Sequence, residues 1–302
     1  MAEGRVVRVA AIQWAAPLEP ALGTLTALIH PPLAQAAQAG AQLVVFAPGI
    51  DQALAAFAAR EAEPPAAPEV RRFAAEQKLA MALSQRFDAL GRALASQYRV
   101  VLALGSVLVR RLEGTVRVAY LYGPKGDLLG FQGQTHRSPA EREHDLLVET
   151  TLSPIDTPVG RVGLVTGADV EYPEVSRILC LQGAEILVHQ GMLARFSEAL
   201  ALSRLWREVQ ANQVFGVEAY SVAEGCRGRS AIHCPVEMAP DRSGWLARAA
   251  DDAQPAVVVA DLDFDRLKQV TGAYPLHALR NPGLYRRYLP VIYDRSEDHD
   301  RA

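Results

Sequence analysis

The sequence predicts a mixed α/β protein, and three observations lead to that fold class. Along the 302 residues, apolar runs of strand length alternate with longer stretches of helical periodicity. Two of the runs, at 6–12 and 43–46, are apolar throughout except for Arg8, which is typical of strands covered on both faces. The segment 161–174 predicts a buried strand, a sharp turn at Gly167 and a helix that begins near Pro173. Many hydrolases display a nucleophile at such a corner.

Further elements are predicted in the first half of the chain. A helix is expected at 22–39, with a kink or a restart at Pro31 and Pro32. The proline-rich residues 60–70 predict a surface loop, and residues 70–98 have the periodicity of one or two helices. Three strands follow, at 100–109, 115–122 and 128–131. The last two are predicted to form a hairpin around a Gly-Pro-Lys-Gly-Asp turn.

The second half of the chain continues the alternation. Strands are expected at 186–189, 215–222, 230–234 and 256–262. Helices are expected at 196–212 and 263–271. No internal repeat or composition break divides the chain, so a single domain is expected over residues 1–293, including the C-terminal tail. The highly charged end, 294–302, is expected to be disordered.

Composition excludes several classes of protein. The hydrophobic share of 50% and the charged share of 22% are those of an ordinary globular chain. A formal net charge of −3 gives no reason to expect binding to nucleic acid or to an anionic membrane. Three cysteines at unpatterned positions argue against disulfides and for a reducing cytoplasm. No signal-peptide pattern and no apolar run of membrane-spanning length is present in the sequence.

Seven segments, taken in order and with their spacing, resemble the nitrilase or carbon–nitrogen hydrolase superfamily. They are 6–13, 40–49, 130–136 followed by Glu141, 161–174, 181–188, 207–215 and 282–285. The resemblance implies an α-β-β-α four-layer sandwich, in which two sheets lie face to face with helices outside. It also implies a homodimer or a larger homo-oligomer.

The resemblance further implies a catalytic triad, which this chain lacks. The family uses a glutamate as general base, a lysine that stabilises the oxyanion and a cysteine as nucleophile. These positions fall on Gly49, Gln134 and Gly167. Sliding the first motif by one residue places the glutamate on Pro48, which is no better. No lysine lies near the expected position and no cysteine precedes Cys180, so local misalignment does not restore the triad.

Other nucleophiles are weak candidates. Cys180 is predicted on a helix among aliphatic residues, as a buried structural thiol. Cys226 has arginines nearby that lower a thiol pKa, but it and Cys234 are expected to have no catalytic role. Thr166 is predicted to point away from the tip of the turn, so it does not replace the nucleophile.

The remaining polar residues suggest a pocket without a metal or cofactor. His136, Glu141, His144 and Asp145 have the wrong spacing for a metal site and predict a solvated loop. By resemblance, Asp169, Pro173 and Glu174 hold the turn and the helix in place. The residues expected to line the pocket are Gly49, Gln134, Glu141, Gly167, Ala168 and Tyr172.

Three hypotheses of function follow. The chain is an inactive homologue that binds a small molecule or a protein, a hydrolase with a rebuilt site, or a structural subunit that pairs with an active paralogue. Any ligand is expected to be small and neutral or cationic. The reason is Glu141: if it lines the cavity without the family lysine, it must be solvated, pair with an arginine such as Arg137 or Arg142, or meet a cationic ligand group.

Overall fold

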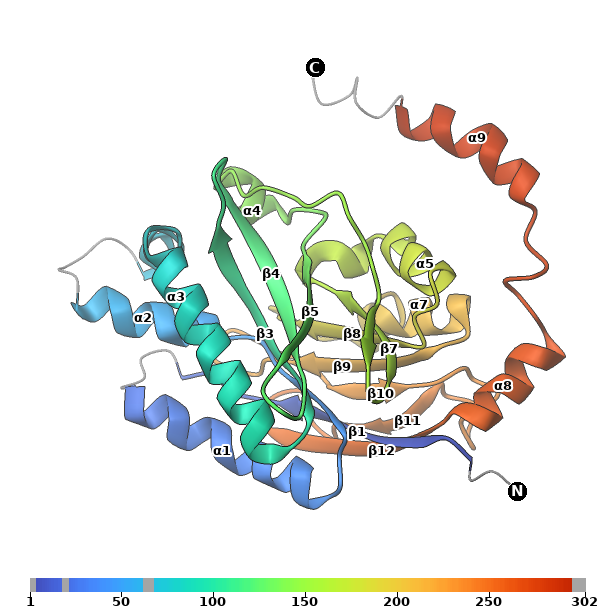
Figure 1. The fold of residues 1–302 in the computed structure, drawn as a ribbon, viewed down its shortest axis with the longest axis horizontal. Coiled ribbons are helices and arrows are strands. Elements are labelled where there is room, and N and C mark those ends of the chain that lie inside the picture. Colours follow the sequence, from blue (N-terminus) through green and yellow to red (C-terminus); the bar gives the residue numbers. More distant parts are fainter. Residues whose placement is uncertain (1–3, 18–21, 62–67, 295–302) are drawn as a thin grey trace.

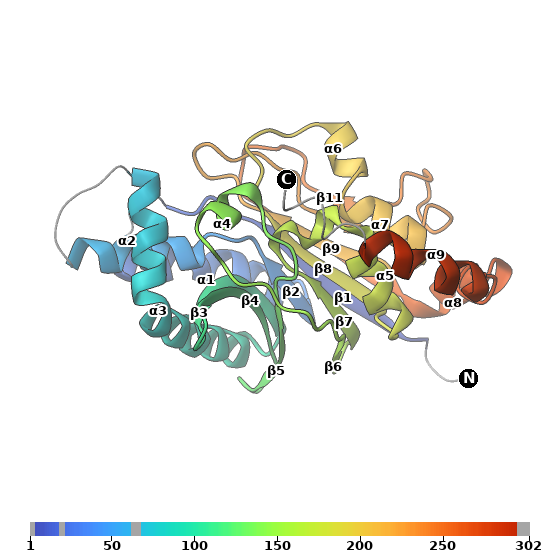
Figure 2. The same cartoon turned by 90° about the horizontal axis from the view of Figure 1, so that it is seen from above.

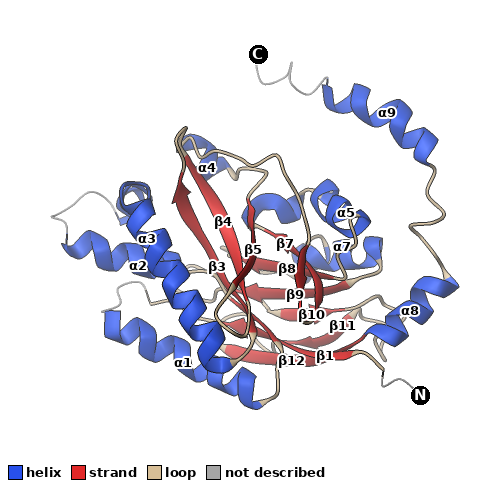
Figure 3. Ribbon diagram, in the orientation of Figure 1, coloured by secondary structure: helices blue, strands red, loops and turns tan. Residues whose placement is uncertain are grey.

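The structure, a computed structural model, describes residues 4–17, 22–61 and 68–294. Two six-stranded sheets lie at the centre and helices cover their outer faces (Figure 1). Figure 3, coloured by secondary structure, shows the strands of both sheets inside and the helices outside. The α-β-β-α sandwich expected from the sequence is confirmed.

Each sheet has three parallel strands at its centre. The first sheet has the order β12 (Ala256–Asp263), β1 (Val6–Gln13), β2 (Leu43–Phe46), β3 (Val101–Arg110), β4 (Thr115–Tyr122) and β5 (Leu128–Gly133). The second has the order β11 (Trp245–Arg248), β10 (Ala231–His233), β9 (Phe215–Tyr220), β8 (Ile186–Gly191), β7 (Gly160–Val165) and β6 (Ile155–Thr157). β1, β2 and β3 are parallel, as are β7, β8 and β9. β2 and β9 are wholly buried, which agrees with the continuously apolar run of β2.

The helices divide between the two outer faces, as the view from above shows (Figure 2). On the side of the first sheet lie α1 (Leu22–Gln38), α2 (Ile50–Glu61) and α3 (Pro68–Tyr98). On the side of the second lie α5 (Pro173–Leu181), α6 (Glu198–Leu202) and α7 (Leu205–Asn212). The others are α4 (Pro139–Glu143), α8 (Phe264–Ala273), α9 (Pro282–Asp294) and the 3₁₀ helix η1 (Gly167–Glu171). Among the described residues, no helix has the length and apolar character needed to cross a membrane.

Direct hydrogen bonds join the two sheets near the carboxyl ends of their parallel strands. The Nε2 atom of Gln190 in β8 donates to the backbone oxygens of Phe46 and Ala103, at 2.7 and 3.0 Å. The backbone N–H of Val222 donates to the oxygen of Trp14 at 2.9 Å. Strand ends from both halves of the chain therefore meet in one region, as the alignment with the hydrolase superfamily predicts.

Three helical predictions need correction. α1 continues through Pro31 and Pro32 without a break. The helix expected at 196–212 is two helices, because Ser203 and Arg204 interrupt it. The tail, which lacks clear periodicity, nevertheless forms α9.

Shorter elements also differ from the prediction. The loop expected around Glu141 contains α4, whose start has a capping box between Ser138 and Glu141 and a proline in the first turn. The strands β6 and β11 were not predicted. Most of the predicted loop 60–70 and all but the first residue of the predicted disordered end, 294–302, lie outside the described residues.

Candidate functional site

The turn after β7 has the geometry of a nucleophile elbow. Gly167 has a φ of 56°, in the left-handed region that favours glycine. Two residues on, the fully buried carboxylate of Asp169 accepts hydrogen bonds from the backbone N–H groups of Thr135 and His136, at 3.0 and 2.8 Å. The Thr135 hydroxyl also donates to it at 2.8 Å. Asp169 therefore fixes the elbow against the segment that follows β5, which is the structural role expected for it.

Gln134 occupies the space directly in front of the elbow. Its side chain is buried, and a Cβ atom added to Gly167 would lie 2.3 Å from its Oε1 atom. Its Nε2 atom donates to the His136 backbone oxygen and to Glu141 Oε2, both at 2.6 Å. Its Oε1 atom is buried without a hydrogen-bond partner. A side chain at position 167 and the present position of Gln134 are thus mutually exclusive.

Glu141 is paired, but not with either of the expected arginines. The Nε atom of Arg117, on β4, donates to Glu141 Oε1 at 2.9 Å. The backbone N–H and the hydroxyl of Ser138 each donate to Oε2 at 2.9 Å. Burial alone raises the pKa of Glu141, but Arg117 and these hydrogen bonds outweigh burial and hold the pKa below its ordinary value. Pairing with an arginine, one of the three expected outcomes, is what the structure has, but the partner is Arg117 on β4 and not the suggested Arg137 or Arg142.

Arg117 also contacts a second buried carboxylate. Its Nη1 atom lies 3.2 Å from Asp51 Oδ2, at the start of α2. Burial raises the pKa of Asp51, and the attraction of Arg117 offsets this only in part. A continuous network runs from α2 through Arg117 and Glu141 to Gln134 and Gly167.

Gly49 lies at the other end of this region and lines a cavity. Its φ of 123° is one that other residues rarely adopt, and a Cβ atom there would lie 2.6 Å from that of Ala16. The cavity, of about 50 Å³, is lined by Ala16, Pro17, Gly49, Gln52, Ala53, Met192, Ala223, Glu224 and Cys226. Of the six residues expected to line a common pocket, Gly49 alone lines this cavity. Gln134, Glu141 and Gly167 pack against one another instead.

The residues after the elbow point elsewhere. The ring of Tyr172 stacks on that of His136, with centroids 3.6 Å apart, and remains 38% exposed. Glu171 forms an ion pair with Arg204. Neither Tyr172 nor Ala168 lines the cavity.

The three cysteines differ in accessibility. Cys180 and Cys234 are buried, and burial raises the pKa of each thiol to about 12. Cys226 is partly exposed and reaches the cavity. The prediction of a structural thiol holds for Cys180, whereas the position of Cys226 beside Gly49 was not predicted.

A buried polar cluster on the helix side of the second sheet was also missed. His189 Nδ1 donates to the Val165 backbone oxygen at 3.0 Å, and Arg204 Nη2 approaches His189 Nε2 at 3.4 Å. Glu218 accepts from the Tyr220 hydroxyl at 2.6 Å and lies 3.3 Å from His233. A histidine and a glutamate inside otherwise apolar strands were the available signal.

Comparison with known proteins decides the family. The carbon–nitrogen hydrolase family matches residues 7–271. The chain belongs to this family. Among the described residues of this family member, no group of three or more histidine, cysteine, aspartate or glutamate side chains is arranged to hold a metal ion.

Individual relatives are distant. The human deaminated glutathione amidase is 26% identical over 44% of this chain and 40% of its own length. The N-carbamoylputrescine amidase of Arabidopsis thaliana is 24% identical over 62% of this chain and 64% of its own length. The chain thus spans less than two thirds of the length of these curated relatives.

Solved structures share the fold across the whole chain. A carbon–nitrogen hydrolase from Helicobacter pylori G27 has a TM-score of 0.73 and 19% identity, over 95% of this chain and 99% of that one. A mutant of the amidase from Nesterenkonia sp. AN1, which carries acrylamide added to its active-site cysteine, has a TM-score of 0.69 and 19% identity, over 93% and 99%.

The packing of Gln134 against the elbow can be tested by a double-mutant cycle. Gly167→Ala is expected to destabilise the fold by about 2–4 kcal/mol, from left-handed backbone strain and overpacking. Gln134→Ala should relieve the overpacking, so the two changes should couple by about 1–2 kcal/mol in denaturant unfolding. Gly225→Ala, at a φ of 77° with no neighbour within 4 Å, isolates the backbone strain. Additive effects of Gly167→Ala and Gln134→Ala would refute the contact.

The buried histidine predicts a pH dependence of stability. Burial lowers the pKa of His189 from 6.5 to about 4. Between these values the unfolded chain binds a proton that the folded chain does not, so stability increases as the pH rises from about 4 to 6.5. The shift corresponds to about 3 kcal/mol.

The measurement compares wild type with His189→Asn, whose amide can replace the bond to Val165. Chemical denaturation at several pH values should give a flatter profile for the variant across this window. The difference between the two proteins isolates His189 from the carboxylates whose pKa values are also shifted. Parallel profiles would contradict the assignment.

Proposed function

We propose that this chain is a non-catalytic member of the carbon–nitrogen hydrolase family that binds a small molecule. The observation that carries the proposal is the position of Gln134, whose amide fills the place in front of the elbow where the nucleophile of the family stands. A bound substrate carbonyl would need that same space. A cytoplasmic location is also proposed, because three cysteines at unpatterned positions favour a reducing compartment.

Loss of the triad argues against hydrolysis at the elbow. Gly167 has no side chain to attack a carbonyl, Gly49 cannot act as a base, and Gln134 is uncharged. Removing a nucleophile that acts as part of such a unit typically lowers the rate by about 10⁶-fold. Arg117, the cation that contacts Glu141, is engaged by the two carboxylates of Asp51 and Glu141.

A rebuilt hydrolase is the second candidate, and one observation favours it. Cys226 and Glu224 line the same cavity as Gly49, so a thiol and a carboxylate lie near the position of the family base. This arrangement lacks the buried cation that stabilises an oxyanion. It therefore ranks below the non-catalytic role.

The ligand is proposed to be small and neutral or cationic. Gln134 and Glu141 are hydrogen-bonded to each other. We therefore propose that the ligand binds in the cavity beside Gly49 and does not contact these two residues. Glu224 is the charged residue among those that line this cavity. An anionic ligand would meet its carboxylate at close range.

Self-association is proposed from the exposed C-terminal helix. α9 stands away from the body of the molecule (Figure 1), held by a hydrogen bond between Tyr293 and Glu174. Its apolar residues are between 42 and 57% exposed: Leu284, Tyr285, Tyr288, Leu289, Val291, Ile292 and Tyr293. A surface of this kind marks an interaction site. We propose that a second copy of the chain covers it, or an active paralogue in the structural-subunit alternative.

The absence of elbow chemistry can be tested with amides and an electrophile. Incubation with simple amides, nitriles, N-carbamoylputrescine and deaminated glutathione should give no turnover and no acyl adduct by intact mass. Acrylamide should add only slowly, at Cys226, and the Cys226→Ser variant should not be modified. Turnover that is lost in Cys226→Ser would overturn the proposal in favour of the rebuilt hydrolase.

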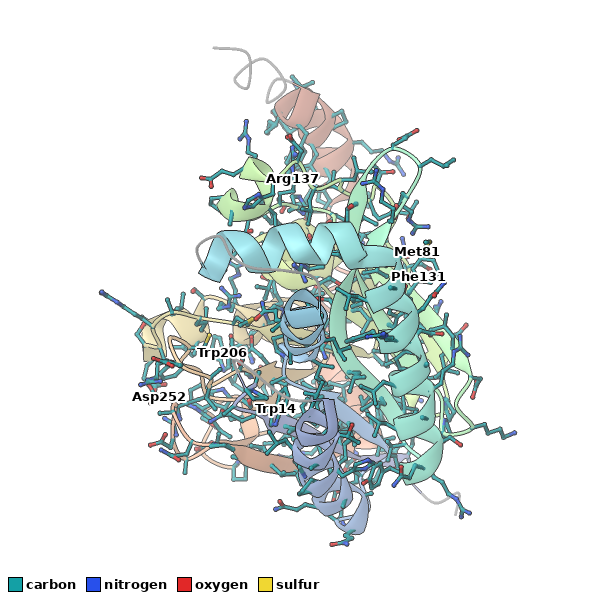
Figure 4. All side chains as sticks on the ribbon, turned by 90° about the vertical axis from the view of Figure 1, so that its left-hand side faces the viewer. Trp14, Met81, Phe131, Arg137, Trp206 and Asp252 are labelled. Atoms are coloured by element: carbon teal, nitrogen blue, oxygen red, sulfur yellow. The ribbon has the colours of Figure 1, made fainter. Side chains whose placement is uncertain are left out.

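Oligomeric state gives the second test. Light scattering at micromolar concentration should give at least a dimer, because an isolated chain would expose the apolar residues of α9. Tyr288→Ser combined with Ile292→Ser should shift the protein towards monomer. Met81→Ser, at a 68% exposed residue on α3 (Figure 4), is the control and should change nothing. A monomeric wild type would refute the proposal.

A further inference from the structure

The cavity beside Gly49 lies where parallel strands from both sheets end. Ala16 follows β1, Gly49 follows β2, Met192 follows β8 and Ala223 follows β9. β1 is parallel to β2, and β8 to β9. Ligands of α/β proteins bind in the crevice outside the carboxyl ends of such strands. The cavity therefore has the position that is typical of a ligand-binding site in this class of fold.

The surroundings of the cavity are firmly positioned. Trp14, labelled in Figure 4, is buried and packs edge-on against Phe46 with ring centroids 5.1 Å apart, and its ring lies 4.0 Å from the place of a Cβ atom on Gly49. Residues 223–226 form a tight turn, in which the Cys226 N–H donates to the Ala223 oxygen at 2.8 Å. Gly225 supplies the left-handed residue of this turn, with a φ of 77°. The cavity is thus shaped before any ligand arrives.

The lining combines an apolar surface with one acidic group. Ala16, Pro17, Ala53, Met192 and Ala223 provide the apolar part. The polar lining residues are Gln52, Cys226 and Glu224, the last of which is exposed at the rim. The Gln52 Nε2 atom points to Met192 Sδ, at 3.6 Å, which orients the carboxamide at the cavity wall.

The volume limits the size of a ligand. A cavity of about 50 Å³ has room for about three to five water molecules, at roughly 10–15 Å³ each. A ligand of a similar number of non-hydrogen atoms fills it.

We propose that this cavity binds a short primary alkylammonium ion, of ethyl to butyl length. The ammonium group pairs with Glu224 and donates a hydrogen bond to the carboxamide oxygen of Gln52, while the alkyl stem lies against Ala53 and Met192. The proposal rests on the proposed function in one respect, that the cavity serves binding and not hydrolysis. Affinity is expected to be about millimolar, because so small a ligand makes few contacts.

Cys226 provides a reporter inside the cavity. Burial keeps the thiols of Cys180 and Cys234 unreactive at neutral pH, with pKa values of about 12. Iodoacetamide should therefore alkylate Cys226 selectively, with loss of iodide, and intact mass gives the rate. Propylammonium at about ten times its dissociation constant should slow the alkylation by about tenfold. Propanol and propionate at equal concentration and ionic strength should leave the rate unchanged.

Variants test whether the protection of Cys226 from alkylation comes from an ammonium ion bound in the cavity. Glu224→Gln should abolish protection, whereas Glu113→Gln, at an exposed carboxylate on the loop between β3 and β4, should retain it. Ala16→Leu, which fills the cavity, should also abolish protection. Ligand-observed NMR with Cys226→Ser gives a second measurement that does not depend on thiol reactivity.

Several outcomes would overturn the inference. These are equal protection by propionate, protection that persists in Glu224→Gln, or no binding of propylammonium by NMR. Failure of this inference is distinguishable from failure of the proposed function, since the amide and nitrile assays test hydrolysis separately. An inert protein that binds no alkylammonium ion would refute the ligand and leave the non-catalytic role standing.

Discussion

The guanidinium of Arg117 allows two carboxylates to be buried beside the elbow. Burial penalises the charged form of Asp51 and of Glu141, and Arg117 contacts both. Because Glu141 stays ionised, it accepts a hydrogen bond from Gln134. Because Gln134 is held there, its amide oxygen lies where a side chain at Gly167 would have to be. The packing around Gln134 and Gly167 depends on this one cation.

The elbow at Gly167 does not line the cavity beside Gly49. Asp169 still fixes the elbow against the segment after β5, so the backbone geometry of the family is kept without its reactive groups. Open space lies instead beside Gly49, between strand ends of the two sheets. Uncharged residues at Gly49, Gln134 and Gly167, together with a small cavity nearby, support the proposed binding role.

A second buried network supports the elbow from the helix side. Arg204 pairs with Glu171 at the end of η1 and lies against the neutral ring of His189. Since His189 Nδ1 donates to a carbonyl oxygen, its Nε2 atom is the acceptor, which suits a neighbouring guanidinium. Protonation of His189 would place two cations together in a buried site. Acid should therefore weaken the helix-side support of the elbow before it disturbs the apolar core.

Local sequence determined much of the fold. Apolar runs located the central strands, such as β1 and β2, because strands buried on both faces must be largely apolar. The hairpin of β4 and β5 followed from its glycine-proline turn. Gly49, Gln134 and Gly167 could be placed at the triad positions because strand order and spacing are preserved along the chain.

Tertiary structure decided what periodicity does not encode. The break between α6 and α7 lies at Arg204, whose partners Glu171 and His189 are distant in sequence, so nothing local marks it. The partner of Glu141 proved to be Arg117, 24 residues away on β4, and not the nearby arginines that sequence proximity suggested. The cavity likewise exists only because four strand ends meet. The sequence alone determined which side chains are present, because that does not depend on the fold. Packing between distant segments decided which of these side chains pair and where a cavity remains open.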